Sequence, residues 1–219
     1  MTKVALKRCL DIAGATGLLI VFAPIIIVVA ILIKLDSPGP VFFRQDRAGK
    51  NAEPFLIWKF RTMVENAVNQ GAGFATFHAD PRITRSGAWL RKYRIDELPQ
   101  IFNVLCGQMS IVGPRPLLPN YLHAYSERDR RRLLVKPGVT GWQQVNGGSR
   151  NTWDERITLD LWYVDNWGPW IDIKVMFLTV FVVLKADSVY GKDGWQRSGH
   201  PAGSALVVDQ RKGQIHEHE

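Results

Sequence analysis

The sequence has only two cysteines in 219 residues, and they are far apart. Cys9 and Cys106 form no CxxC motif, so neither a disulfide framework nor a zinc site is indicated, and a reducing compartment is the default. Acidic residues are also few, with 20 Asp and Glu against 28 Lys and Arg and a net charge of +8. This balance favours anionic lipid or phosphorylated substrates. Nucleic acid is not expected, because zinc-finger spacing, an RNP pattern and basic heptads are all missing.

Ionisable side chains are almost absent from residues 10–33, where Asp11 is the only one. As a helix, this segment can cross about 30 Å of hydrocarbon, and it has no small-residue cleavage motif of a signal peptide. Basic residues flank both of its ends, so a simple span would break the positive-inside tendency. Pro24 near the middle removes a helical hydrogen bond. We therefore favour a re-entrant helix-break-helix anchor over residues 1–36. A kinked spanning helix is the alternative.

A compact, mostly helical domain with one small β-hairpin is expected after the anchor. Residues 41–44 and 55–60 are strand-like runs on either side of a polar stretch that contains glycine, which predicts a hairpin. The fold class is therefore α+β. The domain is expected over residues 37–190, followed by a polar, partly mobile tail over 191–219.

Two further segments are predicted to be interfacial or amphipathic helices. Residues 171–184 are strongly apolar but too short to span a bilayer. We expect them against the core or in the plane of the membrane interface, with Trp162, Trp167 and Trp170 at headgroup depth. Residues 117–134 predict an amphipathic helix with four arginines. Its basic face is either simply solvated or, as we prefer, in contact with anionic lipid headgroups.

Asp96 and Glu97 are adjacent carboxylates in a basic and apolar neighbourhood. Nearby cations should keep both ionised and could balance a bound metal or polyphosphate. A helix capped at Thr84 or Ser86 precedes the pair, and Pro99 suits the first turn of the helix that follows. The pair then lies at a helix start, where backbone N–H groups also bind anions. The alternative is that both carboxylates only complement the helix dipole.

Two other stretches carry candidate binding groups. Lys59 and Arg61 alternate along the second predicted strand and should point to one side. They could contact phosphate or guard a strand edge with charge. Residues 137–148 contain too many turn residues for a regular helix and form a loop suited to a base or sugar. Trp142 in this loop could equally be a core anchor.

Seven short motifs follow one another along the chain. They are Lys7-Arg8 with Asp11, GPVFFRQ at 39–45, KFRTM at 59–63, DPRIT at 80–84, RIDELPQ at 94–100, MSIVGPRP at 109–116 and PGVTGW at 137–142. In this set and order the sequence resembles the bacterial sugar transferase family, the monotopic phosphoglycosyl transferases, in its small form. The resemblance covers residues from about 7 to 190.

The resemblance implies transfer of a sugar 1-phosphate from a UDP-sugar to polyprenyl (undecaprenyl) phosphate, with Mg²⁺, as the initiating membrane step of glycoconjugate assembly. The products are polyprenyl-diphosphate-sugar and UMP. Asp96 is implied as the nucleophile, through an aspartyl-phosphosugar intermediate, and as a metal ligand, while Glu97 positions the metal or the acceptor. A carboxylate can attack a diphosphate only if its charge is neutralised, and Arg91 and Arg115 could do this together with magnesium, with Lys59 and Arg61 as weaker candidates. The candidate residues of the nucleotide or sugar loop are Pro137, Gly138, Thr140, Gly141, Trp142 and Arg150.

Arg150 departs from the family pattern, in which arginine directly follows the glycine at position 147. The resemblance also implies a monotopic protein of the bacterial inner membrane with its domain on the cytoplasmic face, and a homodimer stays open. Two other classes stay open on the residues alone. One is a non-catalytic scaffold that binds anionic lipid at the membrane surface. The other is a hydrolase with paired carboxylates, although adjacent side chains cannot easily flank a scissile bond.

Overall fold

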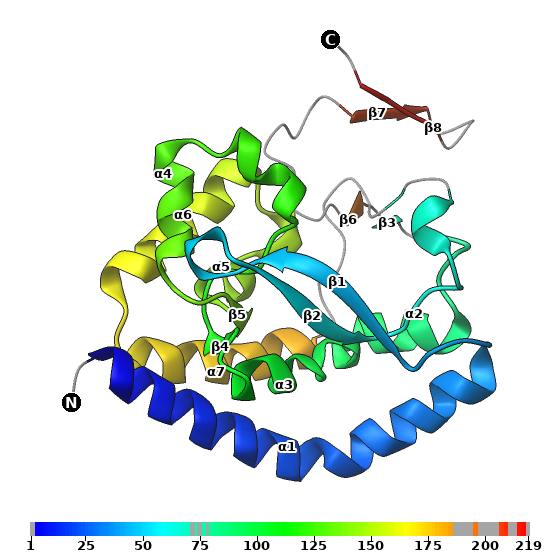
Figure 1. Ribbon diagram of the computed structural model, residues 1–219, viewed down its shortest axis with the longest axis horizontal. Coiled ribbons are helices and arrows are strands. Elements are labelled where there is room, and N and C mark those ends of the chain that lie inside the picture. Colours follow the sequence, from blue (N-terminus) through cyan, green and yellow to red (C-terminus); the bar gives the residue numbers. More distant parts are fainter. Residues whose placement is uncertain are drawn as a thin grey trace.

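The computed structural model describes residues 3–70, 73, 76–77, 79–185, 195–196, 206–209 and 214–217. Helices and strands are mixed in it, as predicted, and helix α1 (Lys3–Asp36) runs along one side of an α+β body (Figure 1). The tail predicted over residues 191–219 lies largely outside the described residues.

Helix α1 continues through Pro24, so the predicted interruption between two half-helices is wrong. A proline removes one helical hydrogen bond and can bend a helix without ending it. Figure 1 shows α1 as a shallow arc whose two ends turn towards the body. Within the described part of the chain it is the one helix long and apolar enough to cross a membrane. Its buried side chains are Asp11, Ala15, Val29 and Ile33.

Polar contacts fasten both ends of α1 to the body. Near the N-terminal end, Lys7 Nζ lies 2.7 Å from Asp172 Oδ2. At the C-terminal end, the Asp36 carboxylate accepts hydrogen bonds from the backbone N–H of Ser86 at 2.9 Å and from its hydroxyl at 2.7 Å. Because both ends bind the same body, tertiary contacts as well as the proline hold α1 in its arc.

Strands β1 (Phe42–Ala48) and β2 (Pro54–Phe60) form the predicted antiparallel hairpin. Strand β1 is longer than predicted, because the polar residues after Arg44 continue the ladder instead of forming a loop. Alternate residues of a strand point to opposite faces. Phe55 and Ile57 of β2 are buried in the core, and Phe43 lies opposite Lys59 in the register.

Helix α2 (Arg85–Lys92) begins at the predicted cap, where the Thr84 side chain accepts a hydrogen bond from the Gly87 N–H. The short 3-10 turn η3 (Ile95–Glu97) and helix α3 (Gln100–Leu105) follow. The predicted carboxylate pair therefore lies in a turn just before α3 rather than in its first turn. Gln100 starts α3 immediately after Pro99, which is the residue at its cap.

A short parallel pair joins the second half of the body, with β4 (Ser110–Val112) beside β5 (Gly138–Thr140). The buried core lies between α1, β2, α3, this pair and the last two helices. The remaining helices are α4 (Glu127–Arg130), α5 (Trp142–Val145), α6 (Trp153–Asn166) and α7 (Pro169–Leu184). The remaining strands are β3 (Thr76–Phe77), β6 (Trp195–Gln196), β7 (Leu206–Asp209) and β8 (Gln214–Glu217). The other 3-10 turns are η1 (Lys50–Ala52), η2 (Ala67–Asn69), η4 (Pro119–Ala124), η5 (Arg131–Leu134) and η6 (Gly148–Arg150).

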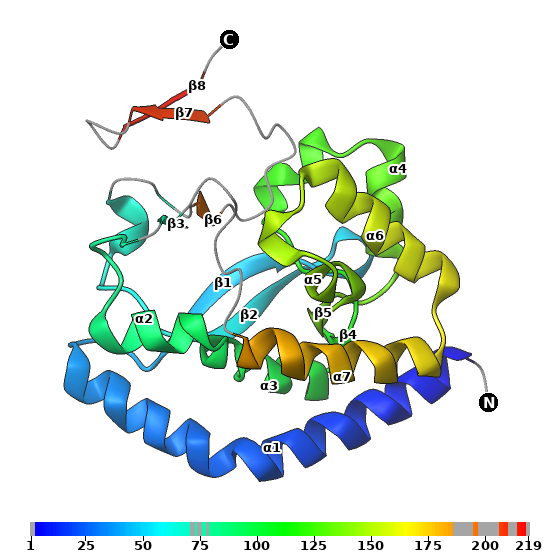
Figure 2. The ribbon, with the colours of Figure 1, turned by 180° about the vertical axis from the view of Figure 1, so that it is seen from behind.

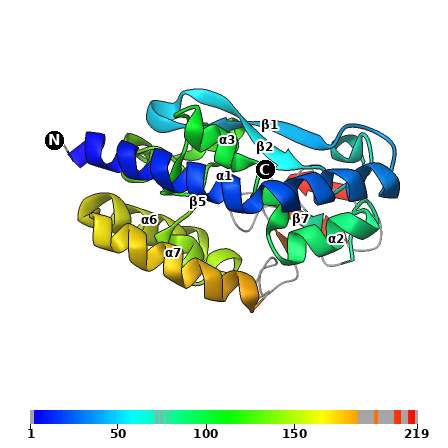
Figure 3. The same cartoon turned by 90° about the horizontal axis from the view of Figure 1, so that it is seen from below.

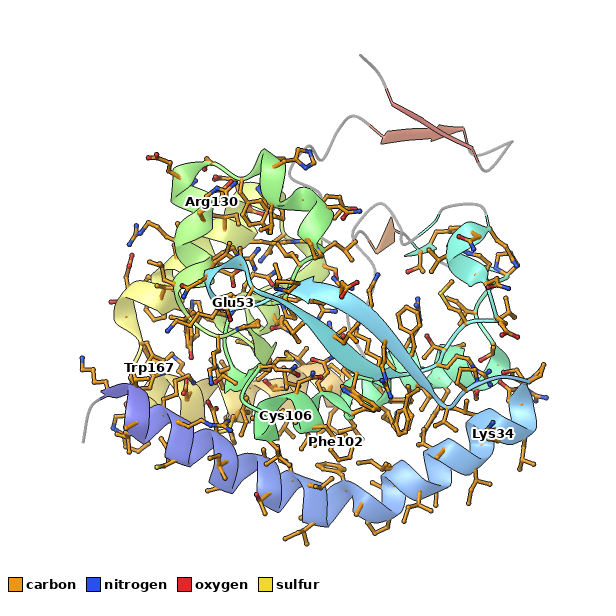
Figure 4. The ribbon with its side chains drawn as sticks, viewed as in Figure 1. Lys34, Glu53, Phe102, Cys106, Arg130 and Trp167 are labelled. Atoms are coloured by element: carbon orange, nitrogen blue, oxygen red, sulfur yellow. The ribbon has the colours of Figure 1, made fainter. Side chains whose placement is uncertain are left out.

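The basic stretch 117–134 is not the single amphipathic helix that its sequence predicts. It folds into η4, α4 and η5, with a capping box at Ser126 that starts α4. Three of its four arginines pair with acidic side chains of α6, as in the pair formed by Arg131 Nη2 and Asp165 Oδ1 at 2.5 Å. Figure 4 shows Arg130 on the side of the body away from α1. This stretch therefore does not share a face with the apolar helix.

Helices α1 and α7 lie side by side on one face of the molecule, as Figures 2 and 3 both show. Helix α7 exposes large apolar side chains at this face, including Trp170 at 80%, Phe177 at 62% and Leu184 at 72% exposure. Exposed apolar patches of this extent mark an interaction surface. The predicted apolar helix over residues 171–184 is confirmed.

Candidate active site

A cavity of about 390 Å³ lies between the β1–β2 hairpin, α2, η3 and the helices α5 and α6. This volume is within the usual range for small-molecule sites. Both predicted carboxylates, Asp96 and Glu97, line it. Cationic side chains also line it and outnumber the acidic ones, so the cavity suits an anionic ligand. They are Arg47, Lys59, Arg61, Arg91, Arg94, Arg115, Arg132 and Arg156.

The turn η3 points both carboxylates into this cavity because of its apolar neighbours. Arg94 has a left-handed backbone with φ of 55° and starts the turn. Ile95 and Leu98, three residues apart, pack against a buried cluster that contains Phe60. The two side chains between them are left to face the cavity.

Glu97 is held between two cations. Its Oε1 lies 2.7 Å from Lys59 Nζ and 2.8 Å from Arg115 Nη2, and the side chain is buried. Burial alone would raise the pKa of Glu97, but the charges of Arg115 and Lys59 outweigh it and hold this pKa well below its usual value. In return, the Glu97 charge raises the pKa of Arg115. Glu97 therefore remains an anion that fixes both cations.

Asp96, unlike Glu97, is not held by cations of the described residues. Its carboxylate accepts no hydrogen bond and forms no ion pair among the described residues, although it lines the cavity. Burial raises the pKa of Asp96, and the neighbouring Glu97 charge adds to the rise, against the opposing charge of Lys59. A carboxylate without partners in a cation-lined cavity is available to react with, or bind to, a ligand.

Arg115 is positioned by the turn that carries it. Gly113 lies so close to the next segment that a Cβ there would come within 2.5 Å of the Lys136 carbonyl oxygen. The buried Arg132 donates a 3.0 Å hydrogen bond to the Arg115 carbonyl and forms a 2.5 Å ion pair with Asp160 of α6. The Arg115 backbone is thus held from two sides, which fixes the position from which its side chain reaches the cavity.

Arg91 also reaches the cavity from a fixed position. Its Nε donates to Thr62 Oγ1 at 2.9 Å, and its Nη1 donates to Thr76 Oγ1 at 3.1 Å.

Burial lowers the pKa of Lys59, and the Glu97 charge opposes that fall. Arg91 and Lys59 both line the cavity, and their contact with phosphate stays a prediction.

Arg61 lines the cavity, but its guanidinium binds the end of the apolar helix. Its Nη2 donates to the carbonyl oxygens of Ser37 at 2.7 Å and Ile33 at 3.3 Å, and its Nη1 donates to the Pro38 carbonyl. The structure therefore gives Arg61 a role in holding the C-terminal end of α1. The predicted phosphate contact of this residue has to compete with these bonds.

The predicted nucleotide or sugar loop lies mostly outside the cavity wall. Trp142 stacks on Trp162 with 4.6 Å between ring centroids, and Thr140 shares a 2.7 Å hydrogen bond with Thr179. None of the predicted loop residues lines the cavity. The six predicted residues are Pro137, Gly138, Thr140, Gly141, Trp142 and Arg150. Their neighbours Gln143, Gln144, Gly148 and Ser149 do line it.

Several cavity residues were not predicted from the sequence. Arg47 is one of them, and burial together with the Arg115 charge lowers its pKa to about 10. The alternation of Gln45 and Arg47 along a strand was an available signal, since it places both on one face. Arg156 and Asp160 are one helical turn apart on α6, which is also a recognisable spacing. The sequence analysis predicts a loop after Arg44, whereas β1 continues to Ala48 and brings Arg47 to the cavity.

The fold thus combines a long apolar helix with a body whose cavity suits a phosphorylated ligand. The chain belongs to the bacterial sugar transferase family, whose model matches residues 2–186. The predicted family is therefore confirmed.

Three relatives show the range of this similarity. An uncharacterized sugar transferase of Bacillus subtilis, EpsL, is 44% identical over 184 residues, which are 84% of this chain and 90% of the relative. The undecaprenyl-phosphate glucose phosphotransferase of Komagataeibacter xylinus is 45% identical over 80% of this chain and 35% of its own length. The UDP-glucose:undecaprenyl-phosphate glucose-1-phosphate transferase of Escherichia coli is 44% identical over 80% of this chain and 39% of its own. The chain thus spans less than half the length of the last two.

Proposed function

We propose that this protein transfers a sugar 1-phosphate from a UDP-sugar to polyprenyl phosphate, giving polyprenyl-diphosphate-sugar and UMP. The names of its relatives support this reaction, since several are transferases that act on undecaprenyl phosphate. One observation carries the mechanism. Of two adjacent carboxylates in the cavity, Glu97 is bound by Lys59 and Arg115, whereas Asp96 has no bonding partner among the described residues.

In the first step, an Asp96 carboxylate oxygen attacks the β-phosphorus of the UDP-sugar. A new P–O bond forms, the bond from that phosphorus to the bridging oxygen breaks, and its electron pair leaves with UMP. A carboxylate can attack a diphosphate only where the charges of the diphosphate are neutralised. Arg91 and Arg115 supply fixed cations for this, and Glu97 acts by holding Arg115 and Lys59 in place.

In the second step, a phosphate oxygen of polyprenyl phosphate attacks the phosphorus of the aspartyl-phosphosugar. The P–O bond to Asp96 breaks, and its electrons return to the carboxylate. The enzyme is thereby restored and the lipid-linked product is released. Because one residue serves both steps, the two substrates can use the same cations in turn.

Magnesium fits this site only as a partner of the substrate. No group of three His, Cys, Asp or Glu side chains comes together in the described part of the chain. The unbonded Asp96 carboxylate is one oxygen donor, and Mg²⁺ is commonly held by one or two carboxylates together with substrate phosphates and water. When bound, the ion would neutralise diphosphate charge.

The proposed reaction also suggests how the apolar face formed by α1 and α7 is oriented towards the membrane. A monotopic, re-entrant α1 would leave the body on the cytoplasmic face of the inner membrane, with α7 in the interface. The fastening of both ends of α1 to one body supports a helix that enters and leaves on the same side. Headgroup contacts of anionic lipid would then come from residues beside α1 and α7 rather than from the stretch 117–134.

Trapping the intermediate tests the proposed function. We expect the wild type, given UDP-sugar labelled in its sugar and magnesium but no lipid, to retain label on a peptide that contains Asp96. The adduct should be sensitive to hydroxylamine, as acyl phosphates are, and polyprenyl phosphate should remove it. Asp96→Asn should release no UMP, because an amide does not attack the phosphorus.

Glu97→Gln is the matched control, since it changes the neighbouring carboxylate by the same atoms. We expect this variant to form the adduct slowly, still on Asp96. Label on Glu97 would reverse the two assignments. Transfer without any adduct, under a ternary-complex rate law, would show direct attack by the lipid phosphate instead. A protein that released no UMP from any of a panel of UDP-sugars would be a membrane-surface scaffold rather than this enzyme.

A further inference from the structure

The side chains on one face of strand β1 change from apolar to charged along the strand. Phe43, Gln45 and Arg47 are alternate residues of β1 and therefore share a face, and all three line the cavity. Phe43 is 37% exposed, whereas Arg47 is only 8% exposed. The cavity wall thus runs from an exposed aromatic side chain, through an amide, to a buried guanidinium.

The aromatic end of this wall lies beside the C-terminal end of α1. Phe42, next to Phe43, packs against a buried cluster that contains Val29 and Ile33 of α1. Figure 1 shows the start of β1 close to the end of α1. The last turns of α1 expose apolar side chains here, with Leu35 at 79% exposure. Apolar surface is therefore present both on the membrane-type helix and at the neighbouring rim of the cavity.

The reactive groups are close to this rim. Phe43 is the register partner of Lys59, whose ammonium binds Glu97. Asp96 lines the same cavity as Phe43 and Lys59. A ligand that lies against Phe43 can thus extend a charged head towards Lys59 and Asp96.

We propose that Pro40, Phe42 and Phe43 form the entrance for the isoprenoid chain of the lipid acceptor, with its phosphate directed towards Lys59 and Asp96. This inference rests on the proposed function and adds the position of the acceptor. An isoprenoid phosphate matches both features of the wall, because its tail is apolar and its head is anionic. A UDP-sugar is polar over most of its length and matches the polar part of the cavity wall that includes Gln143, Ser149 and Arg156.

The energetic reason is burial of apolar surface. Pro40 and Phe43 of this rim are exposed to water in the protein alone, and an isoprenoid tail would cover them. Covering one phenylalanine side chain corresponds to a change in affinity of about tenfold to a hundredfold. The polar head alone gains nothing from Phe43, so this residue should act in the second step of the reaction and not in the first.

Measuring the two steps separately tests the inference. The variant Phe43→Ser removes the aromatic ring, and Leu56→Ser is the matched control, because Leu56 is a 45% exposed side chain of the same hairpin that does not line the cavity. Each protein is first mixed with UDP-sugar and magnesium, and the burst of UMP is measured. The adduct is then chased with increasing polyprenyl phosphate in bilayer nanodiscs.

We expect Phe43→Ser to impair only the reaction of the adduct with polyprenyl phosphate. The lipid concentration that gives the half-maximal rate of this reaction should rise about tenfold or more. Leu56→Ser should match the wild type in both steps, and Phe43→Leu, which keeps an apolar side chain, should recover most of the chase. A chase in Phe43→Ser equal to that of Leu56→Ser would overturn the inference alone. A weakened UMP burst in both Phe43 variants would instead place the nucleotide base against the ring. No burst in the wild type would overturn the proposed function and this inference with it.

Discussion

Replacing each of the two adjacent carboxylates by its amide should change the free energy of unfolding differently. Glu97→Gln removes a buried anion from between Lys59 and Arg115, which approach it to 2.7 and 2.8 Å. Removing one partner of a buried ion pair leaves the other charge uncompensated and costs about 3–5 kcal/mol. Asp96→Asn removes a carboxylate that has no bonding partner among the described residues, so it should leave the free energy of unfolding unchanged or higher.

The expected difference is large enough to measure as a melting temperature. For a chain of this length each kcal/mol shifts the midpoint by about 2–4 °C, so Glu97→Gln should melt about 6–20 °C below the wild type. Tryptophan fluorescence of the protein in nanodiscs would report the midpoint. Equal destabilisation by the two amides would refute the division between a bound and an unbound carboxylate.

The pH dependence of the two variants should differ in sign. The pKa of Glu97 is lowered in the folded protein, so its stabilising contribution is present above the unfolded pKa and is lost as pH falls through the folded value. The pKa of Asp96 is raised, so ionisation of Asp96 costs stability as pH rises from the unfolded value to the folded one. As the pH rises between these two pKa values, the free energy of unfolding of Asp96→Asn should increase relative to that of the wild type. A constant difference between them across this pH range would contradict the raised pKa.

Two further predictions concern the phosphate clamp and the anchor. Arg115→Ala should lower turnover by a hundredfold or more, on the order of the loss of one transition-state donor, and Arg115→Lys should recover little of it, because lysine lacks the two-pronged guanidinium. Turnover near the wild-type value in both variants, at saturating magnesium, would remove Arg115 from the site. For a re-entrant α1, cysteines at Lys3 and Ser37 in a variant without the native cysteines should both react with a membrane-impermeant reagent only from the cytoplasmic side. Labelling of the Lys3 position from the periplasm would show a spanning helix.

Local signals were sufficient for much of the fold. The hairpin follows from two strand-like runs around a polar stretch, and the start of α2 follows from the capping side chain of Thr84. The long apolar run predicts α1, but not its continuity through Pro24. Whether a proline interrupts or only bends a helix depends on what holds the two halves. Here contacts of both ends with distant residues keep them in one arc.

The roles of individual cations could not be predicted, because they depend on which distant groups each one meets. Lys59 and Arg61 alternate on one strand, yet one binds Glu97 and the other binds the carbonyl groups at the end of α1. The sequence does not decide whether Trp142 contacts a ligand or anchors the core. In the structure its ring stacks on Trp162, which brings it into the packed part of the body.

The amino-acid sequence already shows two adjacent carboxylates among cations, and the family resemblance implies that Asp96 is the nucleophile. Neither residue type nor spacing distinguishes Asp96 from Glu97, since both are acids in the same turn. Only the tertiary structure separates them, because β2 brings Lys59 and the turn at Arg115 brings a guanidinium to Glu97 and not to its neighbour. Opposite shifts of two pKa values in adjacent residues are the physical result.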